Sequence, residues 1–182
     1  MTSTANKAYK FFLLLVFCFL FRLLPFRVPN VEPIMASLMP LAGAFGAFTS
    51  FIFGISSVLL YDIVTGTLGV HTFFVAGAFG TLGIFSGMYF KRHTGNISNY
   101  IRFAVVGTLF FDAVTGLMPG PLFYGQSFAV ALSGQIPFTA LHLLGNVAFA
   151  ATLSPVIHYL LIKKRKPDLV ISKALVLSPK II

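Results

Sequence analysis

Between Glu32 and Asp62 the chain carries no charged residue, and this stretch limits the possible folds more than any other feature. As one helix, residues 31–61 would be roughly 45 Å long at about 1.5 Å per residue. The hydrocarbon core of a bilayer is only about 30 Å thick. We therefore expect the stretch to break in its glycine-rich middle, "LAGAFGAFTS", giving two short helices joined by a tight turn.

The composition indicates that the lipid bilayer is the solvent of this chain. Hydrophobic residues make up 57% of it and charged residues 9%, whereas a water-facing surface needs about 25–35% charged side chains. A soluble domain is therefore excluded. We predict an all-α integral membrane bundle of six transmembrane helices. The predicted spans are residues 11–26, the two halves of 31–61, 71–90, 100–116 and 137–162.

The remaining segments are assigned around these spans. Residues 117–135 are expected to form a loop that includes a short interfacial helix. The first apolar run has a basic start but no small-x-small cleavage site after it, so we interpret it as a retained span, not a signal peptide. We expect residues 1–166 to form the transmembrane domain and residues 167–182 a cytoplasmic tail.

The basic residues indicate an orientation. Lys and Arg resist translocation and gather in cytoplasmic segments. With both termini in the cytoplasm, only Arg22 and Arg27 of the 13 basic residues fall on the outer side. We therefore predict a multi-pass protein of the cell membrane. The net charge of +9 is read as a topology signal, so no nucleic-acid partner is expected.

No cofactor or metal is predicted from the sequence. Cys18 is the single cysteine, so no disulfide can form within the chain. The four histidines show no short spacing typical of metal ligands.

Two spans end in nearly the same phrase, "LLYDIVTG" at 59–66 and "LFFDAVTG" at 109–116. Both spans run outward, so Asp62 and Asp112 should reach the outer surface. Glycine is common where a helix ends in the left-handed conformation, but an acid is disfavoured at the negative end of the helix dipole. Arg22 and Arg27 are the available fixed cations on that side, and we expect one of them to lie within salt-bridge reach of Asp62, Asp112 or Glu32. The phrase is either a parallel two-span repeat or convergence on one way of ending a helix.

Polar side chains collect in the outer third of the predicted bundle. His142 and Asn146 lie four residues apart, so they share one helix face. His142 lies about one and a half turns into its span, so its depth should approach that of Asp62 and Asp112. Polar groups within a membrane are costly and usually face a cavity, a partner or a pathway. We therefore predict an outward-facing pocket for a small polar or aromatic solute, walled by Phe and Tyr. Its candidate substrate-binding residues are Asp62, Asp112, His142, Asn146, Tyr124, Asn30 and Glu32.

Structural roles for the same residues stay open. Asp62 and Asp112 could be structural partners of Arg22 and Arg27, or solvated at the interface. His142 could make only a helix-to-helix hydrogen bond, and Asn146 could join helices in the same way. The phrase "AGAFG" occurs at both 42–46 and 76–80, which indicates close helix packing, as do Gly77, Gly80, Gly83 and Gly87. The Phe residues are interpreted as mostly lipid-facing.

The sequence resembles the substrate-binding S components of energy-coupling factor (ECF) vitamin transporters over about residues 8–165. The resemblance is carried by "FRLLPFRVPNVEPIMASLMPLAGAFGAF", by the span ending at Asp62, and by "GQIPFTALHLLGNVAFAATLSPVIHYLLIKK". It implies six helices, cytoplasmic termini and a vitamin-sized solute in an outward pocket. It also implies a transmembrane T component and two ATPase subunits on other chains, since this chain has no phosphate-binding Gly-Lys-Ser/Thr loop.

One feature departs from that family. Many S components carry an Ala-x-x-x-Ala face on the first helix that docks on the T component, but here the helix reads "KFFLLLVFCFLFRLL". Docking could therefore use another surface, or the protein could act alone. A structural or assembly membrane protein without a ligand is kept as a separate alternative. An intramembrane enzyme is disfavoured because no Ser/His dyad motif, His-Glu-x-x-His motif or metal-spaced cluster is present.

Overall fold

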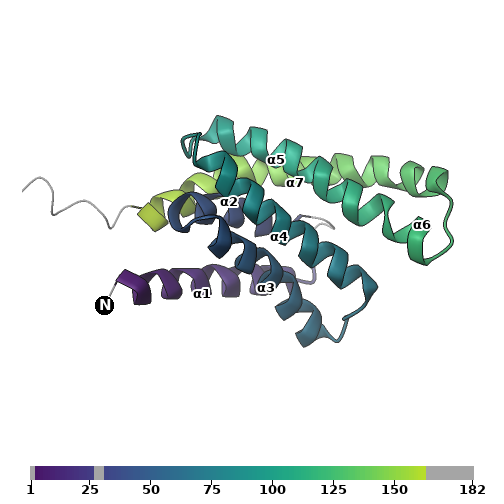
Figure 1. Cartoon of the computed structure of the whole chain (residues 1–182), viewed down its shortest axis with the longest axis horizontal. Helices are drawn as coiled ribbons and strands as arrows, with labels where there is room; N and C mark the ends of the chain where they lie inside the picture. The colour runs from purple at the N-terminus through teal and green to yellow at the C-terminus, as the bar shows by residue number, and fades with distance from the viewer. Residues whose placement is uncertain (1–2, 27–30, 163–182) are drawn as a thin grey trace, which may run out of the picture.

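The computed structural model describes residues 3–26 and 31–162, and this part of the chain is helical without any strand. Figure 1 shows the helices lying side by side in one elongated bundle. In chain order they are α1 (Ser3–Arg22), α2 (Ile34–Phe45), α3 (Ala47–Thr65), α4 (Val70–Phe90), α5 (Ile97–Asp112), the π-helical turn η1 (Ala113–Leu117), α6 (Pro119–Phe123) and α7 (Phe128–Ile162).

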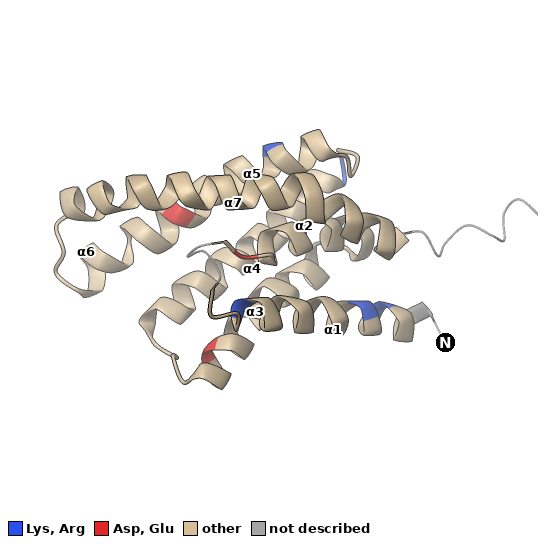
Figure 2. Cartoon of the chain, turned by 180° about the vertical axis from the view of Figure 1, so that it is seen from behind, with Lys and Arg blue, Asp and Glu red and all other residues tan. Residues whose placement is uncertain are grey.

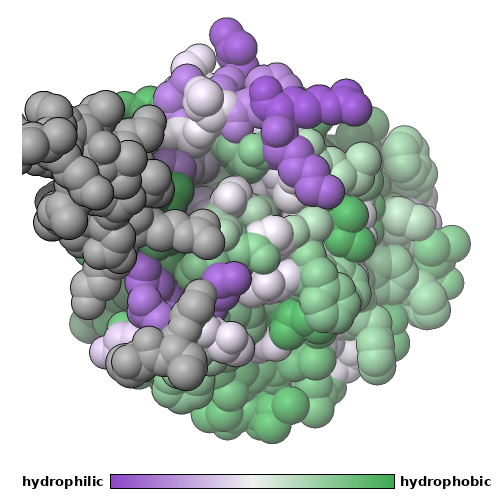
Figure 3. All heavy atoms as spheres, turned by 60° about the vertical axis from the view of Figure 1, so that its left-hand side comes forward, coloured by the Kyte–Doolittle hydropathy of each residue, from purple (hydrophilic) through white to green (hydrophobic). Residues whose placement is uncertain are grey.

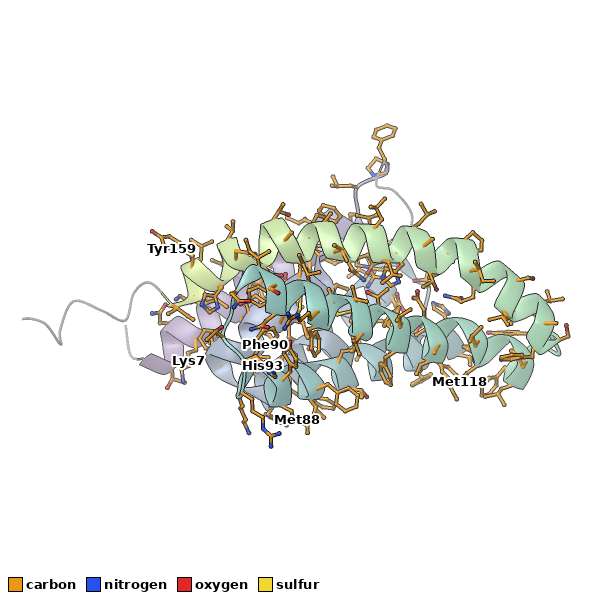
Figure 4. All side chains as sticks on the ribbon, turned by 90° about the horizontal axis from the view of Figure 1, so that it is seen from above. Lys7, Met88, Phe90, His93, Met118 and Tyr159 are labelled. Atoms are coloured by element: carbon orange, nitrogen blue, oxygen red, sulfur yellow. The ribbon has the colours of Figure 1, made fainter. Side chains whose placement is uncertain are left out.

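Six of these helices run along the bundle, and the predicted all-helical fold with six such helices is confirmed. Five stretches are long and apolar enough to cross a membrane, and α2 is a shorter apolar helix. The start of α1 lies against the end of α7, because the Nζ of Lys10 donates to the carbonyl oxygens of Leu160 and Leu161 at 3.1 and 2.7 Å. Figure 4 accordingly shows Lys7 and Tyr159 at one end of the bundle and Met118 at the other.

The predicted break in residues 31–61 is confirmed at Gly46. This residue separates α2 from α3 and has a φ of 96°, a backbone conformation that side chains other than glycine rarely adopt. Its N–H still bonds to the carbonyl of Ala42, so the turn is tight. The chain therefore reverses within a single residue.

Glycines let α3 and α4 approach closely, as the sequence predicted for most of them. A Cβ on Gly83 would lie 2.5 Å from the backbone nitrogen of Phe51, and a Cβ on Gly54 would lie 2.6 Å from the carbonyl oxygen of Phe79. Gly77 is different, because it is exposed and no atom lies within 4 Å of its Cβ position. The close-packing prediction is therefore wrong for Gly77.

Helix α2 occupies the middle of the bundle. All of its residues from Ile34 to Ala42 are buried. The hydroxyls of Ser50 on α3 and Ser154 on α7 donate to its carbonyls, at Leu38 (2.8 Å) and Ala36 (2.9 Å). With 12 residues it is about 18 Å long, so the helices around it extend further than α2 does.

Several boundaries differ from the sequence prediction. The first helix, predicted over residues 11–26, covers Ser3–Arg22. Residues 128–135 were expected to belong to a loop, but α7 begins at Phe128 and continues through Pro137 and Pro155 for 35 residues. Proline is tolerated within helices of this kind because neighbouring helices and local adjustments satisfy the freed backbone groups. The fifth helix also does not end at Gly116, since η1 continues it to Leu117. The expected short helix in this region is present as α6.

Candidate functional site

Two hydrogen bonds join α5 to α7 at successive turns. The Nδ1 of His142 lies 2.7 Å from Oδ1 of Asp112, and the Nδ2 of Asn146 donates to the hydroxyl of Thr108 at 2.8 Å. The two α5 residues are four positions apart, as are the two α7 residues, so the pairs lie one above the other on antiparallel helices. The expected similar depth of His142 and Asp112 is confirmed, because the two side chains touch.

The Asp112–His142 pair is enclosed by aromatic rings. Asp112 is only 2% exposed, and its second carboxylate oxygen, Oδ2, has no hydrogen-bond partner among the residues that the structure describes. The rings of Phe111 and Phe138 meet the imidazole edge-on, at centroid distances of 5.4 and 5.8 Å. Directly after Asp112 the helix widens into η1, and such π-helical turns are frequent at functional sites.

Asp62 belongs to a separate group at the start of α4. Its Oδ2 accepts a 2.7 Å hydrogen bond from the hydroxyl of Thr72 and lies 3.7 Å from Nε2 of His71. These two residues form part of the first turn of α4, where the helix dipole favours a negative charge. The positive end of the α4 dipole therefore stabilises the Asp62 carboxylate, which the negative end of the α3 dipole destabilises. Gly66 closes α3 in the left-handed conformation, with φ of 69°, as predicted.

Arg22 pairs with Glu32, one of the three acids that an arginine was expected to reach. Its Nε lies 3.5 Å from Oε1 of Glu32. Its guanidinium also donates to the carbonyl of Ser57 at 3.3 Å and lies over the ring of Tyr61 at 4.0 Å from the centroid. The prediction that an arginine reaches one of the three acids at this end is confirmed.

The suggested pairing of the aspartates with Arg22 is wrong. Within the described segments, Asp62 contacts Thr72 and His71. Asp112 bonds to His142. Arg27 and Asn30, which the sequence also suggested, lie outside the described residues.

A cavity of about 230 Å³ lies between these elements. Glu32 lines it just before the start of α2, while Arg22 at the end of α1 and residues of α4, α5, η1 and α7 form its walls. Because α2 is short, the longer helices surround a space beyond its first turn. The full lining is Arg22, Glu32, Val75, Phe79, Phe111, Thr115, Phe138 and His142.

The size and chemistry of this cavity suit a small ring compound. A dry cavity of about 150 Å³ can hold benzene, so 230 Å³ has room for a ring with polar substituents. Three phenylalanine rings offer stacking or edge contacts. Arg22 supplies hydrogen-bond donors, Glu32 supplies acceptors, and the imidazole of His142 supplies either. Figure 2 shows that the acidic residues gather toward this part of the bundle, away from the N-terminus.

The seven sequence candidates occupy different places. Glu32 and His142 line the cavity. Asp112 and Asn146 are buried on the same two helices and hold α5 against α7. Asp62 is buried in its own group with Thr72, and Tyr124 is 65% exposed between α6 and α7. The seventh, Asn30, is the one outside the described residues.

Sequence reasoning predicted phenylalanine in the pocket wall but did not identify which residues provide it. Phe79, Phe111 and Phe138 line the cavity, and Phe79 and Phe111 are buried, although the Phe residues were interpreted as mostly lipid-facing. Thr115 belongs to the repeated phrase and could have been found there, since Thr65 and Thr115 each donate to the carbonyl four residues earlier at 2.8 Å. His71 was set aside because its sequence spacing to other histidines is uninformative.

The structure therefore defines an α-helical bundle, consistent with a multi-pass membrane protein, with a small polar and aromatic cavity near one end. Within residues 3–26 and 31–162, no group of three His, Cys, Asp or Glu side chains could hold a metal ion. Comparison with models of known protein families, with curated proteins and with solved structures gave no match to this chain.

Proposed function

We propose that the protein is the membrane-embedded solute-binding subunit of an ECF-type importer for a vitamin or vitamin precursor. It lies in the cell membrane with both termini in the cytoplasm, so that the cavity is near the outer surface. The observation that carries this proposal is the cavity itself, where an Arg22–Glu32 pair and His142 meet three phenylalanine rings. A bundle without a ligand has no need to keep such groups around a cavity.

The groups around the cavity are already oriented for binding. Arg22 is fixed by Glu32, by the Ser57 carbonyl and by the ring of Tyr61. His142 is fixed by Asp112. A solute entering the cavity therefore meets polar groups whose conformational freedom is already restricted, which lowers the entropic cost of binding. The solute would lie against the phenylalanine rings, with its polar edge toward Arg22, Glu32 and His142.

Transport would need other chains. The resemblance to S components implies a transmembrane T component and two ATPase subunits that supply the energy. The outer surface of α1 carries large exposed side chains, including Phe12, Leu13 and Leu20. It therefore lacks the small-residue face that many S components use, and we propose that the T component docks on a different surface of the bundle.

One observation favours a purely structural role. The Asp112–His142 and Thr108–Asn146 pairs already satisfy each other, apart from one carboxylate oxygen, so they could serve only to join α5 to α7. In that case the protein would be an assembly component of the membrane and the cavity would stay empty of solute. Asp62 and Asp112 belong to separate hydrogen-bonded groups, and we assign neither of them a catalytic role.

A binding assay separates the two functions. The purified protein in detergent is titrated with a panel of vitamins and their precursors by isothermal titration calorimetry. We expect one compound to bind at micromolar concentration or below. Glu32→Gln and His142→Ala should each weaken that binding roughly tenfold to a hundredfold, since a buried polar group that loses its partner costs about 1–3 kcal/mol.

The control is Phe17→Leu on α1, which is 39% exposed and does not line the cavity. This variant should bind like the wild type. Absence of binding across the panel, or equal affinities for Phe17→Leu and His142→Ala, would favour the structural role instead.

A further inference from the structure

We propose that a groove between α4 and α5, at the end of the bundle remote from the cavity, is a binding site for an anionic phospholipid of the surrounding bilayer. The proposal rests on the membrane placement proposed above but is independent of the solute cavity. Its evidence is a cluster of three exposed cations placed at the head of an apolar groove.

The groove has an apolar part and a basic part that share two residues. The apolar part has a volume of about 340 Å³ and runs between α4 and α5, with Val106 and Phe110 in its wall and Arg102 in its lining. The basic part has a volume of about 510 Å³ and includes Lys91 and Arg92. Phe85 and Tyr89 line both parts, so the two are adjacent.

The charges at this end are unbalanced. Lys91, Arg92 and Arg102 are exposed. No acid of the described residues lies near them, because Asp62 and Asp112 are at the far ends of α3 and α5 and Glu32 pairs with Arg22. Figure 3, which brings this end forward, shows hydrophilic side chains gathered beside an apolar flank. The site therefore suits a ligand that combines an anionic group with a hydrocarbon chain.

The dimensions fit one lipid chain. Along α5, Arg102 and Phe110 are eight residues apart, which is about 12 Å of helix. One leaflet supplies about half of the roughly 30 Å hydrocarbon thickness. A headgroup phosphate at Arg102 would thus place an acyl chain along most of the depth of its leaflet. Basic pockets between helices on the cytoplasmic side are known binding places for anionic headgroups.

An aromatic pair sits at the boundary between the two parts. The ring of His93 stacks on that of Tyr89, with centroids 4.0 Å apart and planes 10° from parallel. The His93 Nδ1 also lies 2.9 Å from the carbonyl of Tyr89. Figure 4 shows His93 beside Phe90 and Met88 on this flank. Tyrosine is enriched at the level of lipid headgroups, so this pair marks where the headgroup and the chain would separate.

Native mass spectrometry of the full-length protein in detergent tests the site. Dioleoyl-phosphatidylglycerol and dioleoyl-phosphatidylcholine are added in separate titrations. We expect a one-to-one adduct with phosphatidylglycerol that survives activation, and a much weaker one with phosphatidylcholine. Arg102→Gln should weaken the phosphatidylglycerol adduct roughly fivefold to tenfold, from the loss of about one favourable charge interaction. Val106→Trp, which fills the groove without changing charge, should weaken it as well.

Matched controls use positions away from the groove. Lys7→Gln removes one charge at the same end of the bundle, and Val156→Trp adds the same bulk at an exposed position of α7. Both should bind phosphatidylglycerol like the wild type. Because Arg102 and Val106 are exposed, their variants should fold, which circular dichroism checks.

Equal binding of the two lipids, or equal binding by Arg102→Gln and Lys7→Gln, would overturn the proposal. The proposal would also be overturned if the wild-type protein did not bind phosphatidylglycerol but copurified with an acidic protein in an Arg102-dependent way. The groove would then be a binding site for a protein partner. Failure of the vitamin panel alone leaves this result unaffected, because no solute is present in the lipid titrations.

Discussion

The Nδ1 of His142 lies 2.7 Å from Oδ1 of Asp112, and both side chains are at least 95% buried, so each is the other's principal polar contact. We expect Asp112→Leu to destabilise the bundle by about 1–3 kcal/mol, because His142 is then left without its partner. Asp112→Asn should cost less, since its amide oxygen can still accept from the imidazole. The measurement is thermal unfolding in detergent.

The double variant gives the decisive test of this pair. If the two side chains stabilise the fold through each other, Asp112→Leu with His142→Leu should be less destabilising than the sum of the single variants. Interhelical hydrogen bonds measured in this way contribute about 0.6–1.7 kcal/mol in membrane proteins. Strict additivity would show that the contact contributes nothing.

The close approach of α3 and α4 predicts opposite effects of two similar substitutions. Gly83→Ala forces a Cβ to within 2.5 Å of the Phe51 backbone nitrogen, so the helices must separate, at a cost of about 1–3 kcal/mol. Gly77→Ala places its Cβ in open space and should be neutral or slightly stabilising, since alanine favours helix. Thermal unfolding of the two variants side by side measures the difference. Equal melting temperatures would contradict the packing described here.

The two copies of the repeated phrase should respond differently at their glycines. Gly66→Ala should cost about 1 kcal/mol because an alanine must then adopt the left-handed conformation. In Gly116→Ala the new methyl would instead meet only the flexible end of the Gln135 side chain, which can shift. Gly116→Ala should therefore cost less than Gly66→Ala, as compared by thermal unfolding. A larger loss for Gly116→Ala would show that the backbone of η1 itself requires glycine.

Cysteine labelling tests the proposed orientation. In a Cys18→Ala background, Ser127→Cys and Thr94→Cys introduce conservative exposed cysteines at opposite ends of the bundle. We expect a membrane-impermeant maleimide to label position 127 in intact cells and position 94 only after permeabilisation. The reverse pattern would place the cavity on the cytoplasmic side.

Local backbone rules predicted those parts of the fold that depend on single residues. The break at Gly46 follows from the length of an uncharged stretch set against the thickness of a bilayer, and the left-handed end of α3 at Gly66 follows from glycine chemistry. The shared depth of His142 and Asp112 follows from helical rise. None of these inferences requires knowledge of which helices are neighbours.

One error came from local composition and the other from unknown neighbours. The start of α7 was placed too late because Ser133, Gly134 and Pro137 have the composition of a loop, yet the segment is helical although only Ala131 of residues 128–135 is buried. Arg22 was suggested as a partner of the aspartates because it is a cation on the right side of the membrane. Only the fold shows which of the three acids Arg22 reaches, namely Glu32, and that Asp62 lies instead at the start of α4.

The buried position of α2 has a consequence for the order in which the protein is made. Its carbonyl at Ala36 accepts from Ser154, a residue 118 positions later in the chain. Chains are synthesised from the N-terminus, so α2 leaves the ribosome long before α7 exists to cover it. This 12-residue helix is too short to cross a bilayer. Until α7 is made, α2 also lacks one of the helices that bury it. The central helix α2 must therefore stay incompletely packed until α7 is inserted. Truncation within α7 should leave it exposed, and we expect the truncated protein to be degraded.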